Sequence, residues 1–110
     1  MRFLLYTVEG GVPAAPPTPQ MMAELGQLTE ETRRAGILLA TGGLDSKSTR
    51  VRSSGGKLTL TDGPFTETKE LTGGFALIEA KSREEAIEWA KRFRKIVGDG
   101  DSIIQEVFGG

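Results

Sequence analysis

Four short apolar runs along the chain predict β-strands. These runs are residues 3–8, 37–40, 75–80 and 103–108. The first three are apolar at nearly every position, which is typical of strands covered on both faces. The fourth is the last predicted element of the fold. In the first run, Phe3 and Leu5 would lie on one face, and Leu4, Tyr6 and Val8 on the other. The first strand is therefore expected at the centre of a sheet.

Two longer stretches repeat apolar residues at helical spacing. In the first, Thr18 and Pro19 predict the helix start, because a hydroxyl caps free backbone N–H groups and proline suits the first helical position. Gly36 predicts its end. The stripe expected to face the core comprises Met22, Leu25, Leu28 or Thr29, Thr32 and Ala35.

The second helix opens with a capping box, in which Ser82 and Glu85 would satisfy each other's backbone N–H groups, and ends at Gly98. Its buried stripe is expected to comprise Ala86, Trp89 or Ala90, Phe93, and Ile96 or Val97. The basic residues 91–95 complement the helix dipole. They are interpreted as a solvated helix end rather than a phosphate site, because no glycine-rich loop accompanies them.

Between the helices, alternating residues on either side of two glycines predict a β-hairpin. Its strands are residues 49–52 and 57–61, joined through Ser53-Ser54-Gly55-Gly56. The apolar side chains of Val51, Leu58 and Leu60 are expected to face inward. The arginines and threonines are expected to face outward.

Prolines are concentrated between Val12 and Pro19, which predicts a stiff loop. The alternative, a proline-rich ligand for a partner protein, is less favoured because no Pro-x-x-Pro repeat extends beyond it. The sequence leaves open whether this segment covers a pocket or only connects two elements.

The elements follow the order β-α-β, hairpin, β-α-β. Without the hairpin this is the split β-α-β order of a ferredoxin-like α+β sheet, formed by a single domain over residues 1–110. Two helices can cover only one face of such a sheet, yet the first strand and residues 75–80 are apolar on both faces. We therefore predict a homodimer whose sheets pack face to face.

Composition narrows the possible partners. The chain has 110 residues, 37% of them hydrophobic and 26% charged, as is usual for a soluble globular protein. Its net charge of −1 gives no general attraction to nucleic acid or an anionic membrane. No segment approaches the roughly 20 apolar residues that span a bilayer. We expect a cytoplasmic protein that binds neither nucleic acid nor membrane.

The chain contains neither cysteine nor histidine. Thiolate chemistry and the commonest metal ligands are thereby excluded, and we expect no metal and no cofactor. Five acidic residues match no calcium-loop spacing: Asp45, Asp62, Glu67, Glu70 and Glu79. Acid–base chemistry would have to use a carboxylate, a lysine or the single tyrosine, Tyr6.

Residues 61–75 carry the densest mixture of turn residues and charges. Asp62-Gly63-Pro64-Phe65 predicts a turn. Two hypotheses stand for Asp62: its carboxylate caps this turn, which we favour, or it lies in a pocket as a general base or ligand anchor. Glu67, Lys69 and Glu70 predict an ion-pair network, with binding of a ligand carboxylate or carbonyl by Lys69 as the alternative. Tyr6 is expected to pack in the core or in a dimer interface.

The chain resembles the YciI-related family and, within it, the DGPF-domain subgroup. The resemblance rests on the hydrophobic first strand and three motifs: residues 35–40, the stretch Asp62–Glu70 with Gly74-Phe75, and residues 82–90. It implies a ferredoxin-like, dimeric α/β-barrel architecture and no agreed reaction. It also implies a regulatory role, since members are sometimes linked in genomes with extracytoplasmic-function sigma factors. A pocket histidine and aspartate have been suggested as a catalytic pair in YciI relatives. Asp62 matches that aspartate, but this chain has no histidine.

Three functional hypotheses follow. The first is a small dimeric domain that binds a small molecule or a protein partner in a regulatory setting, with ligand contacts from Tyr6 and from the central stretch: Asp62, Gly63, Pro64, Phe65, Glu67, Lys69 and Glu70. The second is an enzyme that uses Asp62 as general base on a small acidic or carbonyl substrate, which requires burial to raise the pKa of Asp62. The third is a structural dimer module whose partner is another polypeptide.

Overall fold

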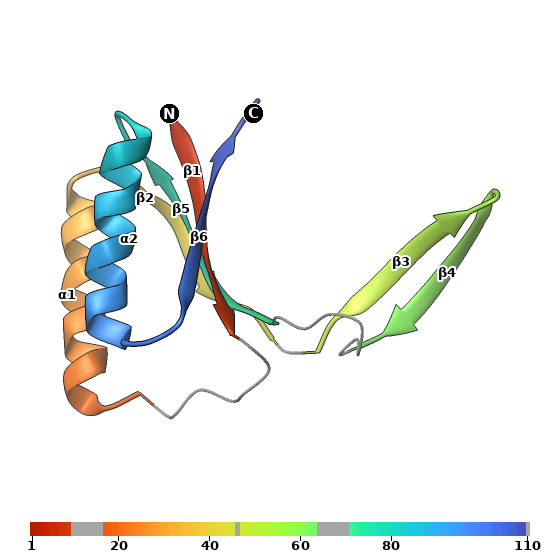
Figure 1. Cartoon of the computed structure of the whole chain (residues 1–110), viewed down its shortest axis with the longest axis horizontal. Coiled ribbons are helices and arrows are strands. Elements are labelled where there is room, and N and C mark those ends of the chain that lie inside the picture. The colour runs from red at the N-terminus through yellow and green to blue at the C-terminus, as the bar shows by residue number, and fades with distance from the viewer. Residues whose placement is uncertain (10–16, 46, 64–70, 110) are drawn as a thin grey trace.

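The computed structural model describes residues 1–9, 17–45, 47–63 and 71–109 (Figure 1). Within these residues the elements follow the predicted order. They are β1 (Arg2–Glu9), α1 (Pro19–Arg34), β2 (Leu38–Gly43), β3 (Thr49–Ser54), β4 (Lys57–Asp62), β5 (Leu71–Glu79), α2 (Arg83–Val97) and β6 (Asp101–Val107). No helix in the described ranges is long and apolar enough to cross a membrane.

Four strands form an antiparallel sheet in the order β2-β5-β1-β6. With the hairpin left out, this is the ferredoxin-like arrangement, so the predicted fold class is confirmed. Strand β1 lies inside the sheet between β5 and β6, as its apolar pattern predicted. Both helices lie on the same face of the sheet (Figure 1).

The core lies between this sheet and the two helices. Phe3 of β1 is 2% exposed and pairs with Ile78 of β5, which is 3% exposed. Ala86 and Ala90 are the buried residues of α2, and such small side chains allow a helix to approach a sheet closely. Burying side chains of the size of Phe3 and Ile78 contributes about 1.5–3 kcal/mol each to folding.

The helix ends form as the sequence predicted. The Thr18 hydroxyl accepts a hydrogen bond from Met21 N (3.1 Å), and Ser82 Oγ accepts one from Glu85 N (3.2 Å). The reciprocal half of the predicted capping box differs, because the Glu85 carboxylate accepts from Lys81 N (3.0 Å) rather than from Ser82. Gly98 ends α2 with a φ of 88°, a conformation in which a side chain would be strained.

The predicted buried stripe of α1 is only partly correct. Thr32 is buried, and its hydroxyl donates to Leu28 O (2.9 Å). Met22 is 56% exposed and Ala35 is also exposed. Helix α1 therefore covers the sheet with a narrower face than its apolar spacing suggested.

Strand β2 corrects the prediction of a strand buried on both faces at residues 37–40. It lies at the edge of the sheet, and Leu39 is 47% exposed. An apolar run indicates extended structure but does not reveal how many neighbours the strand has. Strand β2 also extends to Gly43, and β5 begins at Leu71, so both strands include glycines that the sequence placed in connections.

The hairpin corrects two further predictions. Its strands are joined through Gly55 and Gly56 alone, whose φ values of 56° and 81° are those that a tight two-residue turn requires. The three apolar side chains expected to face inward are exposed: Val51 by 64%, Leu58 by 73% and Leu60 by 74%. The hairpin extends away from the main sheet (Figure 1), so these residues lie outside the core that the described residues form.

Helices α1 and α2 are joined on their outer side by an ion pair. Both terminal nitrogens of Arg92 donate to the carboxylate of Glu31, and Nη2 lies 3.1 Å from Oε1. The guanidinium also lies 4.9 Å from the centre of the Trp89 ring. The hydrogen bond from Arg92 lowers the pKa of Glu31.

Replacing Glu31 with glutamine should destabilise the protein slightly at neutral pH, because the pair is exposed. The ion-pair stabilisation is complete above the unfolded-state pKa of a glutamate, about 4.3, and is lost as the pH falls through the lower folded-state pKa. Urea midpoints of both proteins, measured as the pH is lowered, should therefore converge in acid. A difference that stays constant would contradict this role for the pair.

Candidate functional site

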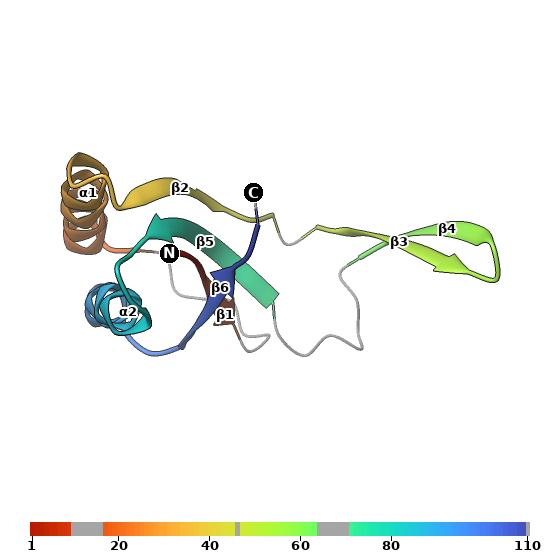
Figure 2. The same cartoon turned by 90° about the horizontal axis from the view of Figure 1, so that it is seen from above.

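The face of the main sheet opposite the helices carries an apolar surface. We call it the open face and define it by residues of β1, β5 and β6 that share one side in the strand registers. Leu4 pairs with Leu77 and Gln105, and Tyr6 pairs with Phe75 and Ile103. Neither helix lies on this side of the sheet (Figure 2). The open face is thus Leu4, Tyr6, Phe75, Leu77, Ile103 and Gln105.

A shallow depression lies on the open face. Leu4, Tyr6, Leu44 and Phe75 line it, and its volume is about 470 Å³. Leu44 follows β2, and its backbone N donates to Gly73 O (3.0 Å), which holds this residue beside β5. The lining is mostly apolar and includes two aromatic rings. Such a surface suits a flat, partly apolar molecule.

The Tyr6 hydroxyl provides a polar group beside this depression. It donates to Gln105 Oε1 across β1 and β6, at 3.2 Å. In this arrangement the phenolic oxygen can still accept a hydrogen bond, and the Gln105 amide nitrogen can donate two. The pair can therefore bind an oxygen substituent as donor or acceptor. The sequence alone did not identify Gln105 as the hydrogen-bond partner of Tyr6.

Gly42 shapes the depression by leaving room for the Phe75 ring. The two residues are paired neighbours in β2 and β5, and a Cβ at position 42 would lie 3.2 Å from Phe75 Cε1. The Thr41 hydroxyl donates to Phe75 O at 2.9 Å and fixes the backbone of this pair. Any side chain at position 42 would push the ring out of place.

Gly42→Ala should move the Phe75 ring and leave the fold intact. We expect the ring resonances of Phe75 to shift in two-dimensional NMR spectra, because the new methyl group is closer than van der Waals contact allows. Gly43→Ala is the matched control, because a Cβ there meets only Gly73 O at an ordinary 3.8 Å. Equal shifts of Phe75 in both variants would contradict this role of Gly42.

Asp62 lies elsewhere, as the last residue of β4 at the base of the hairpin. Its carboxylate is exposed, and Oδ1 accepts a hydrogen bond from the Thr49 hydroxyl at 3.0 Å. The adjacent Gly63 donates its N–H to Ser48 O at 2.6 Å. Within one chain, Asp62 thus closes the open end of the hairpin. The residues that the structure describes do not bury this carboxylate as a general base would need.

The other candidate residues of the central stretch lie outside the described residues: Pro64, Phe65, Glu67, Lys69 and Glu70. The hypotheses about them stay predictions. Asp45 accepts a hydrogen bond from Lys47 N at 3.0 Å, as turn aspartates do. In the described ranges, no three acidic residues lie close enough together to hold a metal ion.

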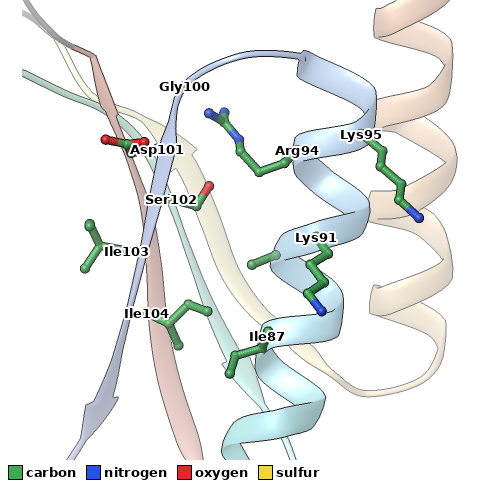
Figure 3. A pocket seen from close by; sticks show the side chains of 10 residues that line it. Ile87, Lys91, Arg94, Lys95, Gly100, Asp101, Ser102, Ile103 and Ile104 are labelled. Carbon is green, nitrogen blue, oxygen red and sulfur yellow. The ribbon is translucent and has the colours of Figure 1, made fainter.

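A second hollow lies between α2 and β6 (Figure 3). Arg94 and Ser102 point into it from opposite sides, and a Cβ on Gly100 would overlap the Arg94 guanidinium. Arg94 Nε and Ser102 Oγ are buried and have no hydrogen-bond partner among the described residues. Lys91 and Lys95 are exposed, and Lys95 lies in the last turn of α2, where a cation offsets the helix dipole.

The fold is that of a ferredoxin-like α+β protein in which the helices cover one face of the main sheet and leave the open face uncovered. The chain belongs to the YCII-related domain family, whose sequence profile matches residues 1–100. The resemblance to YciI-related proteins is thereby confirmed.

Two individual proteins are similar to the chain. An uncharacterized protein of Rhizobium meliloti (strain 1021) is 46% identical over 41 residues, which is 37% of this chain and 33% of that protein. Among solved structures, 5-chloro-2-hydroxyhydroquinone dehydrochlorinase (TftG) from Burkholderia phenoliruptrix AC1100, in complex with 2,5-dihydroxybenzoquinone, superposes with a TM-score of 0.51. That match covers 100% of this chain and 96% of TftG at 17% identity, so it supports the shared fold.

Of the four residues that line the depression, the sequence pointed only to Tyr6. Leu4, Leu44 and Phe75 were not among the candidates, and neither were the adjacent Gly42 and Gln105. Gln105 had a usable signal, because it alternates with Ile103 and so shares its face of the last strand.

Proposed function

We propose that the chain is a homodimeric module that binds a small, flat organic molecule in a regulatory setting, with the ligand on the open face. The observation that carries the proposal is the depression lined by Leu4, Tyr6, Leu44 and Phe75, beside the Tyr6–Gln105 hydrogen bond. Two aromatic rings provide stacking surface, and the hydroxyl and amide provide hydrogen bonds to an oxygen substituent. The regulatory setting rests on the family resemblance.

The chemical class follows from these side chains. An oxygenated aromatic or quinone-like ring combines flat apolar surface with peripheral oxygens, which matches the lining. TftG, which shares the fold, is named for action on a hydroxylated chloroaromatic compound and binds 2,5-dihydroxybenzoquinone. That compound is therefore a reasonable first probe for this chain.

The homodimer is supported by the shape and surface of the single chain. Its Cα radius of gyration is 16.0 Å. A compact domain of this length would have a value of about 13 Å. The open face also exposes aromatic and aliphatic side chains that need cover, and Ile103 on it is 38% exposed. A second copy of the chain, related by two-fold symmetry, can cover this face with the identical face of its own sheet.

Light scattering coupled to size-exclusion chromatography should give twice the chain mass of 11.8 kDa at micromolar concentration. Ile103→Lys should shift the protein toward the single-chain mass, because a buried lysine in an apolar interface is costly. Ile104→Lys is not a suitable control, because that residue packs against the core. Gln27→Lys, on the exposed side of α1, is suitable. A wild-type protein of single-chain mass would overturn the homodimer.

Tyr6→Phe should weaken binding of 2,5-dihydroxybenzoquinone, measured by calorimetric titration. Removing one hydrogen bond and keeping the ring predicts a loss of about 2-fold to 10-fold, from roughly 0.5–1.5 kcal/mol per bond. Thr7→Val is the matched control, because it removes a hydroxyl from the same strand on the opposite face. Binding by wild type that Tyr6→Phe leaves unchanged would place the ligand elsewhere, and no binding by wild type would reject this chemical class.

The alternative function is an enzyme with Asp62 as general base on a small acidic or carbonyl substrate. It is motivated by the family resemblance, in which Asp62 matches the suggested catalytic aspartate. A second copy of the chain would have to bury the Asp62 carboxylate, which is exposed in one chain. Asp62→Asn retains an oxygen that can accept from Thr49, so the variant should fold. Turnover of a probe that is lost in Asp62→Asn while binding persists would support the enzyme. Binding without turnover in wild type would support the module.

A further inference from the structure

The hairpin formed by β3 and β4 has one apolar face and one polar face. In its register, Val51 pairs with Leu60, and Leu58 lies on the same side. The opposite side carries Arg52, Lys57, Thr59 and Thr61, with Arg50. We call the hairpin the arm and the first side its apolar face. The apolar face is 64–74% exposed at its three hydrophobic residues.

The arm stands apart from the other helices and strands that the structure describes. Strands β3 and β4 pair with each other, and neither makes extensive contact with any other helix or strand that the structure describes. An isolated two-stranded hairpin is marginally stable at best in water. An apolar face of this kind therefore implies a surface that covers it.

The arm extends to the side of the sheet where a partner would lie. Figures 1 and 2 both show the helices on one side of the main sheet and the arm on the other. Stacked sheets lie about 10 Å apart, and a strand of six residues spans about 20 Å. An arm of this length would cross the gap between two facing sheets and continue along the partner.

We propose that each arm packs its apolar face onto the partner subunit and closes the partner's ligand depression. Val51, Leu58 and Leu60 would cover the depression lined by the partner's Leu4, the partner's Tyr6, the partner's Leu44 and the partner's Phe75. This inference rests on the proposed homodimer and deepens the proposed function, because it places the ligand between two chains. The site is then incomplete without the second copy.

A second copy is favoured over an unrelated protein by symmetry. Each chain carries one uncovered arm and one uncovered open face, and a two-fold axis brings each arm to the other chain's open face. An unrelated partner would need to match both surfaces. The polar side of the arm, with Arg52 and Lys57, would remain in solvent, as those exposed residues require.

Leu60→Lys tests the inference, with Thr59→Lys as the matched control on the opposite face of the same strand. We expect Leu60→Lys to raise the dimer dissociation constant by about tenfold or more, as central interface substitutions do, and Thr59→Lys to leave it nearly unchanged. At concentrations where both variants are dimeric, Leu60→Lys should also weaken binding of 2,5-dihydroxybenzoquinone. Leu60 is 74% exposed in one chain, so the substitution should not prevent folding.

Cross-linking provides a second measurement. The chain has no cysteine, so introduced thiols are the only ones present. A variant with Leu44→Cys and Leu60→Cys, treated with a short bismaleimide, should give a covalent dimer on a denaturing gel. A variant with Leu44→Cys and Thr59→Cys should give much less.

The outcomes separate this inference from the proposed function. Suppose that the wild type is a dimer, that both lysine variants have the same dissociation constant, and that both cysteine variants cross-link equally. This result would contradict packing of the arm on the partner subunit and would leave the homodimer intact. A weakened dimer with unchanged probe binding would overturn closure of the site. A wild-type protein of single-chain mass would contradict both the homodimer and the packing of the arm on a partner subunit.

Discussion

The need to cover both faces of one sheet governs this protein. Strand β1 is apolar on both sides, with Phe3 buried under the helices and Tyr6 on the open face. Two helices cover only one side, and their packing uses small residues such as Ala86. The remaining face is too apolar to be a good solvent-exposed surface, so the proposed ligand site and the proposed assembly both follow from this uncovered face.

The arm carries a second apolar surface that needs to be covered. Its strands are well formed and its turn has the backbone geometry of a tight hairpin, yet its hydrophobic residues are exposed and lie outside the core that the described residues form. A second copy of the chain would cover the open face and the apolar face of the arm at once. The proposed site then combines aromatic residues from one chain with the aliphatic face of an arm from the other, and excludes water from a depression that is open in the single chain.

The chemistry of the site is limited by composition. Because the chain has no histidine or cysteine, the polar side chains that the described residues bring to the depression are the Tyr6 hydroxyl and the Gln105 amide. These bind and orient oxygen atoms, which fits recognition better than proton transfer near neutral pH. The carboxylates and the lysine of the central stretch stay candidates for acid–base chemistry, and Asp62 among them accepts a hydrogen bond from Thr49 at the base of the arm.

The sequence by itself determined the elements whose signals are local. Thr18, Pro19 and Ser82 mark the helix starts, because capping depends on neighbouring backbone groups alone. The alternation in β1 likewise determined which side chains share a face. The hydrophobic periodicity and the composition of the chain were also sufficient to predict the ferredoxin-like order of helices and strands.

Only the tertiary structure decided which apolar faces have a neighbour. Leu39 and Leu60 show the same local pattern as buried strand residues, yet one lies on an edge strand and the other on an unsupported arm. The depression depends on Leu44, Phe75 and Tyr6 coming together from three separate segments. Hydrophobic periodicity indicates that a side chain should be buried. Which residues bury it is set by contacts between segments far apart in the chain.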